Sequence, residues 1–393
     1  MKQNAVEEVP GLYGPVRIPE RLLQQIWSRS DFDSHNLVSI EGHSIKVISC
    51  GKWNVSHEGP DFLGAEIEID GRLLIGDVEI HFNRIDWLRH GHDKDSNFRS
   101  TILHVVLFAE DPTVESCRSE RHVFPPTLVL LPLLFQSLEE YAEQDALETL
   151  NRVGVDEAIS DWLSLPLDER KSRLLELARQ RWVAKLNHAR ERISSEGWTE
   201  ACHQFALEIL GYRRNRVPMS TLSLAYPFAE MSRLGKSAKQ LFDERVGEWK
   251  LAGLRPANHP LARLRQYLKV IKLRPNWPML LAKVPYALPE GISSRKLLGT
   301  SALRQGFSSV VLGGVIGGTR LETLVVDGFL PLLSAKSGDD LFHHWHLWYA
   351  GDFPEKLKVF LRESGVAGPQ TATPYSNGFF QGALAHFIER NLI

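Results

Sequence analysis

The chain has few cysteines and no long apolar run, and these two absences narrow the classes of protein to which it can belong. Its 393 residues include only Cys50, Cys117 and Cys202, which are too few and too widely spaced for a disulfide framework or a CxxC metal site. The apolar stretch at residues 128–134 contains Pro132 and falls well short of the roughly 18 residues that a membrane span needs. Residues 1–9 lack the basic and apolar regions of a signal peptide. We therefore expect a cytoplasmic protein with no membrane partner.

A large net charge is also absent, but the charge is unevenly distributed. The chain as a whole carries −2. Residues 181–320 contain 23 Lys and Arg against 9 Asp and Glu, a balance of +14, so the remainder carries −16. A basic segment beside an acidic one suggests a partner that is itself an anion, such as DNA or RNA. Arg-rich helical surfaces that serve only solubility would give the same count, and both interpretations stay open.

Length and residue pattern predict two domains of different character. The composition, with 43% hydrophobic and 24% charged residues, is that of an ordinary globular protein, and 393 residues favour two domains over one. We predict an α+β domain over residues 1–135 and a basic, mainly helical domain over residues 136–393. In the second domain, apolar residues recur at helical spacing. Helices are expected at residues 200–210, 221–231, 237–248, 260–271 and 378–391.

The first domain shows strand patterns around a tight turn. A short helix is predicted at residues 19–27, followed by a strand at 45–50. Residues 65–81 predict a hairpin, because Asp70-Gly71 supplies the positive φ angles of a two-residue turn. The continuous apolar run at residues 102–109 is typical of a buried central strand.

The second strand of this hairpin carries the most distinctive chemistry. Asp77, Glu79 and His81 occupy alternate positions, and alternate residues of a strand share one face. Clustered carboxylates repel each other and resist desolvation unless a cation neutralises them. Acids at strand ends provide the open, hard-oxygen site that Mg²⁺ prefers and that phosphodiester hydrolysis requires. A solvent-facing amphipathic strand would show the same alternation and is the alternative.

With Pro60-Asp61 at the start of one hairpin strand and Asp77-x-Glu79-x-His81 near the end of the next, the segment resembles the core of the PD-(D/E)XK nuclease superfamily. The resemblance implies a restriction-endonuclease-like mixed sheet and a Mg²⁺ or Mn²⁺ ion held by Asp61 and an acid of the second motif. Two alignments stay open. Either Asp77 binds the metal and Glu79 replaces the usual lysine, or Glu79 binds the metal and His81 replaces that lysine.

Further candidate ligands lie on either side of the hairpin. The resemblance implies that Glu20, on the first helix, could be the additional acid that some members use. His90, His92 and Asp93 follow the hairpin, and imidazole favours Zn²⁺ or Mn²⁺ over Mg²⁺. A His/Asp metallohydrolase acting on a small phosphorylated or ester substrate is therefore a competing hypothesis, although Zn²⁺ is the less expected metal. His104 lies inside the apolar strand, as a core histidine or as one that faces the site.

Two basic clusters in the helical domain are candidate nucleic-acid contacts. Arg213, Arg214 and Arg216 follow an apolar helix, and His259 and Arg263 are one helical turn apart. Such clusters can bind phosphates and position a nucleic acid without reading its sequence. A solvated helical face produces the same pattern, so both interpretations are kept.

The whole chain also resembles an uncharacterised bacterial family known only as a domain of unknown function. The motifs that carry this resemblance are Gly51-x-Trp53-Asn54, Gly59-Pro60-Asp61-Phe62, Gly76-Asp77-Val78-Glu79-Ile80-His81, Asp86-Trp87-x-x-His90-x-His92, Leu103-His104-Val105-Val106, Leu210-Gly211-Tyr212-Arg213-Arg214-Asn215 and Asn258-His259-Pro260-x-x-Arg263-Leu264. The resemblance implies that the two halves occur together as one unit, and it brings no activity with it.

Together these patterns lead to three hypotheses of function. The first is a metal-dependent nuclease in which Asp61, Asp77 and Glu79 bind the metal and His81 is an accessory base. The second is a non-catalytic nucleic-acid-binding or scaffold protein that kept a nuclease-like core without its lysine. The third is the His/Asp metallohydrolase described above.

Overall fold

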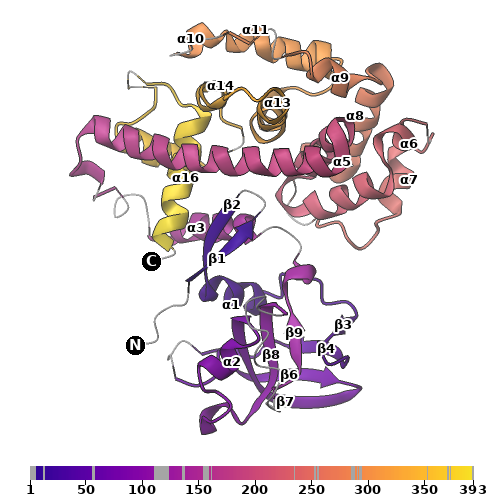
Figure 1. Ribbon diagram of the computed structural model, residues 1–393, viewed down its shortest axis with the longest axis vertical. Helices are drawn as coiled ribbons and strands as arrows, with labels where there is room; N and C mark the ends of the chain where they lie inside the picture. The colour runs from indigo at the N-terminus through magenta and orange to yellow at the C-terminus, as the bar shows by residue number, and fades with distance from the viewer. Residues whose placement is uncertain are drawn as a thin grey trace. The chain divides into compact units, whose positions relative to one another are not determined.

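The computed structural model describes residues 6–11, 14–54, 58–109, 124–134, 138–153, 159–160, 162–233, 235–251, 254, 256–284, 288–289, 291, 294–351, 353–369, 371 and 373–391, with most of the side chains from Pro19 onward. The chain forms two compact units, one mainly of residues 17–141 and one mainly of residues 142–391 (Figure 1). The first contains a mixed sheet and the second is largely helical. The predicted α+β class is therefore confirmed.

The N-terminal unit is built on a sheet with the strand order β3-β4-β6-β7-β8-β9, in which β5 also pairs with β6. Strands β3 to β7 pair antiparallel, whereas β7 pairs parallel with β8 and β8 with β9. The strands are β3 (Leu37–Val38), β4 (Ser44–Ser49), β5 (Lys52–Trp53), β6 (Phe62–Ile69), β7 (Arg72–Asn83), β8 (Thr101–Phe108) and β9 (Thr127–Val129). A separate two-stranded sheet joins β1 (Val6–Gly11) and β2 (Gly14–Pro19).

The predicted hairpin is confirmed as β6–β7. Ile69 pairs with Arg72 across the turn, and Asp70 and Gly71 have φ angles of 49° and 79°, as a type I′ turn requires. The predicted helix and apolar strand are also confirmed, as α1 (Glu20–Ser28) and as β8. Helix α1 buries an apolar face that includes Leu23 and Trp27, both 0% exposed.

Strand β7 is an inner strand, and its C-terminal half is buried on both faces. Val78 and Ile80 are 0% and 1% exposed, and Glu79 and His81 are 2% and 1% exposed. The pairing with β8 shifts by one residue directly before this half, because Asp77 pairs with Thr101 whereas Val78 pairs with Leu103. The extra residue of this bulge, Ile102, lies on β8.

Gly76 allows β8 to approach β7 closely. A Cβ atom on Gly76 would lie 2.4 Å from Ile102 Cγ2 and 2.6 Å from the Ser100 carbonyl oxygen. The same carbonyl accepts a hydrogen bond of 2.9 Å from the Asp77 N–H. The glycine that precedes the acidic motif is therefore explained by packing between the two strands.

The other unit is built from helices around the long element α5. Its helices are α3 (Leu138–Val153), α5 (Leu167–Ala225), α6 (Phe228–Arg233), α7 (Ala238–Asp243), α8 (Pro260–Leu273), α9 (Trp277–Leu281), α10 (Arg295–Leu298), α11 (Thr300–Gln305), α12 (Gly318–Leu324), α13 (Leu330–Ser337), α14 (Phe342–Leu347), α15 (Glu355–Glu363) and α16 (Asn377–Asn391). The helices predicted at residues 200–210, 260–271 and 378–391 are confirmed within α5, α8 and α16. The one predicted at 221–231 is wrong as a single element, since Pro227 separates α5 from α6.

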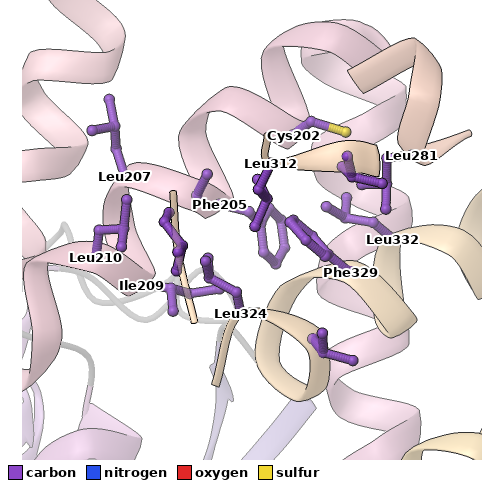
Figure 2. Close-up of a cluster of buried hydrophobic side chains, with 14 of the residues drawn as sticks. Cys202, Phe205, Leu207, Ile209, Leu210, Leu281, Leu312, Leu324, Phe329 and Leu332 are labelled. Carbon is purple, nitrogen blue, oxygen red and sulfur yellow. The ribbon is translucent and has the colours of Figure 1, made fainter. Parts of the chain in front are cut away.

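Element α5 is not a straight rod. Arg192 Nη1 lies 2.8 Å from Glu208 Oε1, although 16 residues of straight helix would separate them by about 24 Å. Gly197, between them, has a φ of 79°, so the chain bends there. The segment after the bend supplies much of the core: Figure 2 shows Phe205 and Ile209 beside Leu324 and Phe329, all 5% exposed or less.

Candidate metal centre

Three histidines of the N-terminal unit converge on one point. His81 comes from β7, and His90 and His92 follow the short helix α2 (Asp86–Arg89). Their ligand nitrogens lie within 4.8 Å of one another. Helix α2 makes this possible because it turns the chain back directly after β7. The turn is fixed by a hydrogen bond of 3.0 Å from the Asn83 N–H to Asp86 Oδ2.

A buried carboxylate completes the group. Glu79 Oε1 lies 3.3 Å from His81 Nε2 and 3.2 Å from His92 Nε2, and His90 Nδ1 lies 3.0 Å from His81 Nε2. A tetrahedral ion with bonds of about 2.0–2.1 Å requires ligand atoms about 3.3–3.4 Å apart. These three separations are close to that spacing, and three imidazoles with one carboxylate are donors of the kind that transition metals favour. We call Glu79, His81, His90 and His92 the histidine cluster.

His104 is the neighbour that orients His81. Its Nε2 lies 2.9 Å from His81 Nδ1, and the side chain is 0% exposed. Burial, with the charges of Arg84 and His92, lowers the pKa of His104 to about 3, so this imidazole is neutral at pH 7. A neutral His104 can accept the Nδ1 proton of His81, which leaves His81 Nε2 with a lone pair that points toward the cluster.

Aromatic rings enclose the cluster on one side. The Trp87 ring centroid is 5.4 Å from those of both His92 and His104, and Phe98 stacks on His92 at 3.7 Å. Trp87 and Phe98 are 4% and 5% exposed. His90, by contrast, is exposed. The cluster therefore has a dry, apolar back and a single member that reaches solvent.

Asp61 is joined to Glu79 through the main chain. The Asp61 N–H donates to Glu79 Oε2 at 2.9 Å, and the Ile80 N–H donates to Asp61 Oδ2 at 3.1 Å. Asp61 Oδ1 accepts from Gln24 Nε2 at 2.9 Å. Glu79 thus turns one oxygen to Asp61 and the other to the histidines. Glu20 precedes Gln24 by one turn of α1 and shares its face of the helix.

The remaining acidic candidates lie apart from this arrangement. Among the described residues, Asp77 accepts hydrogen bonds from the Gly64 N–H at 3.0 Å and from the Ser100 hydroxyl, and none of its contacts reaches Asp61 or Glu79. Asp93 is exposed. The contacts therefore link Glu79 with Asp61 and with His81, and they leave Asp77 and Asp93 outside this group.

The basic candidates of the helical unit have structural partners where they are described. The side chains of Arg213 and Arg214 lie outside the described part of the chain. Arg216 is half-buried. His259 Nδ1 caps α8 by accepting from the Leu261 N–H at 3.3 Å. Arg263 is 7% exposed. Its guanidinium donates to Gln266 Oε1 and Asn258 Oδ1, both at 2.8 Å. These two hydrogen bonds give the side chain a structural role in α8.

Sequence reasoning missed the residues that support the cluster rather than form it. Gln24 and Phe98 were not singled out, whereas Trp87 is part of one of the family motifs. For Gln24 a signal was present, because it lies four residues after the candidate ligand Glu20 and so on the same helical face. For Phe98 no local pattern would have revealed the contact with His92.

The chain belongs to the family of proteins of unknown function DUF2851, whose profile matches residues 20–243. The match begins at the first residue of α1 and includes β7, the histidine cluster and the whole of α5. Neither the curated proteins nor the solved structures provide a significant match. Within the described residues, none of the helices combines the length and the apolar character needed to span a bilayer.

Proposed function

We propose that this DUF2851 protein is a metal-dependent hydrolase of phosphodiester bonds, with DNA or RNA as its substrate. The ion would be bound by the histidine cluster. The observation that carries the proposal is the convergence of three imidazoles, whose ligand nitrogens lie within 4.8 Å of one another, with the Glu79 carboxylate 3.2–3.3 Å from two of them. Because three of the four donors are nitrogen, Mn²⁺ or Zn²⁺ suits the site better than the Mg²⁺ that carboxylates alone would favour.

Each residue of the cluster has a distinct part in this proposal. Glu79, His81 and His92 are buried and would hold the ion, while His90 is exposed and would meet the substrate. A bound ion of this kind lowers the pKa of a coordinated water to about 7 and polarises a phosphoryl oxygen. His90, whose imidazole reaches solvent, would be the ligand on the open side of the ion, where water and substrate enter. Trp87 and Phe98 would keep bulk water from the opposite side.

The choice of a nucleic-acid substrate is supported by two features. The antiparallel hairpin β6–β7, the helix α2 and the parallel strand β8 follow one another in the order that the PD-(D/E)XK resemblance implies. Asp61 and Glu79 are adjacent within that order. The second feature is the +14 balance of residues 181–320, which would attract a polyanion.

The test combines metal analysis with cleavage assays on the full chain. Protein loaded with Mn²⁺ or Zn²⁺ and then desalted should retain about one ion per chain, as one four-donor cluster implies. It should then cleave plasmid DNA, single-stranded DNA or RNA. Glu79→Gln should lose both the ion and the activity, because it removes the anionic donor. The matched control is Asp77→Asn, which neutralises a carboxylate two residues away on the same strand and should keep both.

Different failures would have different meanings. A wild-type protein that retains metal but cleaves no nucleic acid would refute the proposed substrate. Cleavage of a small ester such as bis(p-nitrophenyl) phosphate would then favour the small-substrate metallohydrolase. If Asp77→Asn abolished metal binding and Glu79→Gln did not, the assignment of the ligands to the histidine cluster would be wrong.

A further inference from the structure

The C-terminal part of the helical unit contains a pocket that the proposed function does not use. Its volume is about 640 Å³, within the range of roughly 300–1,000 Å³ found for small-molecule sites. The residues that line it lie between Arg295 and Phe380. They therefore all belong to the helical unit and lie beyond residues 20–243, which the family profile matches.

Arg295 is a fixed positive charge in the wall of this pocket. Its Nε donates to the Leu347 carbonyl at 3.0 Å, and its Nη2 donates to the carbonyls of Trp348, at 3.5 Å, and of Tyr375. Its Cζ lies 4.8 Å from the centroid of the Tyr349 ring. Within the described part of the chain, no carboxylate forms an ion pair with Arg295, and no hydrogen bond uses its Nη1. The guanidinium is thus held in position by neutral groups and keeps two N–H donors to spare.

The pocket has a second cation, and the ion pair that this cation forms is weak. Lys358 lines the pocket, and its Nζ lies 2.8 Å from Glu355 Oε2. The two side chains are 41% and 73% exposed. An exposed pair of this kind contributes about 1 kcal/mol or less, so Lys358 can turn to an anionic ligand at little cost.

The rest of the lining is rich in flat aromatic surface. Phe353 and Phe380 are stacked, with ring centroids 4.7 Å apart and planes inclined by 19°, and Tyr375 lies 5.5 Å from Phe380. Together with Tyr349 these side chains form walls against which a planar ring can stack. A pocket that offers aromatic walls and two cations is suited to a ligand that is flat at one end and anionic at the other.

We propose that this pocket binds a small ligand in which an aromatic ring carries an anionic group, with nucleoside monophosphates as the first class to test. The anionic group contacts Arg295 Nη1 and Lys358 Nζ, where it neutralises a guanidinium that forms no ion pair with the described residues. The ring lies against the aromatic walls. This site is separate from the histidine cluster and needs no metal ion.

The test is titration calorimetry on the full chain with three probes, adenosine monophosphate, 2-naphthoate and inorganic phosphate. We expect the first to bind, and binding of 2-naphthoate with similar strength would show that any aromatic anion is accepted. Lys358→Met should weaken binding about tenfold, the loss expected for one charge-assisted hydrogen bond. Ala350→Trp, which fills the pocket, should abolish binding.

The matched control is Lys296→Met, because Lys296 is exposed, adjoins Arg295 in sequence and does not line the pocket. It should bind as the wild type does, and thermal unfolding of each variant confirms that it is folded. The proposal is overturned if neither aromatic probe binds at millimolar concentration, or if Lys358→Met and Lys296→Met behave alike. Inorganic phosphate that binds as tightly as adenosine monophosphate would overturn the role of the aromatic walls.

Discussion

The substitution Gly76→Ala tests the pairing of β7 and β8 that places Glu79 and His81 in the candidate metal centre. The new Cβ would lie 2.4 Å from Ile102 Cγ2 and 2.6 Å from the Ser100 carbonyl oxygen, so both must move. Overpacking of this kind costs about 1–3 kcal/mol. The displaced carbonyl also weakens its hydrogen bond with the Asp77 N–H, which adds about 1 kcal/mol. We therefore expect a loss of about 2–4 kcal/mol in the stability of the N-terminal unit.

The measurement should report on that unit alone, because a chain of two units need not unfold in one step. Amide hydrogen exchange of Val78 and Leu103, which pair between strands β7 and β8, provides such a readout. Gly306→Ala is the matched control, since nothing lies within 4 Å of the position that its Cβ would take and its φ is −59°. If these amides exchanged as slowly in Gly76→Ala and in Gly306→Ala as in the wild type, the close approach of β8 to β7 at Gly76 would be refuted.

Three further predictions concern the support of the cluster and the helical core. His104→Phe should lower metal affinity about 10–100-fold, as is usual when the partner that orients a ligand is lost; competition with a chelator measures this, with Asp77→Asn as the unaffected control. Burial lowers the pKa of His188 and of His203 to about 4, so the unfolded chain binds more protons between pH 6.5 and 4. The contribution of these two neutral histidines to the free energy of unfolding is therefore complete above pH 6.5 and is lost as the pH falls. Between pH 7 and pH 5, the free energy of unfolding should decrease by about 2 kcal/mol for each histidine. Urea titrations at the two pH values check this, and His203→Gln should show a smaller pH dependence; an unchanged dependence would contradict the assignment. Phe329→Ala should destabilise the helical unit by about 3–5 kcal/mol, whereas a loss below about 1 kcal/mol in urea titration would show that this ring is not in a packed core.

Local patterns were sufficient for the elements whose signals lie within a few residues. Asp70-Gly71 predicted the β6–β7 turn, and the apolar run at residues 102–109 predicted β8, because turn chemistry and burial are encoded at those positions themselves. The bend of α5 at Gly197 was not predicted. A single glycine in a helical pattern has the same appearance whether the helix continues or turns, and only the packing against Phe329 and Leu324 decides between the two.

The sequence indicated the candidate ligands of the site, but it did not indicate which of them lie together in the folded chain. Strand alternation grouped Asp77 with Glu79, whereas the Asp77 carboxylate accepts hydrogen bonds from Gly64 and Ser100, and Ser100 directly precedes β8, which is distant in sequence. His90 and His92 were recognised as possible ligands, yet their meeting with His81 required the reversal at α2. For Arg263 the sequence indicated a charge but not the partners, Asn258 and Gln266, that bury it.

The mixed direction of the sheet also fixes an order of assembly. The hairpin β6–β7 closes over the two residues Asp70 and Gly71, whereas the parallel pairing of β7 with β8 must wait until the chain has passed through α2 and η1 (Ser96–Phe98). Short loops close faster than long ones, and non-local pairing forms late. His81 therefore reaches its strand early and meets His90 and His92 when the chain reverses at α2, but it meets His104 only when β8 pairs with β7. The contact that orients His81 is thus made by the later, parallel pairing, so tight binding of a metal ion at the histidine cluster would report that β8 has paired with β7.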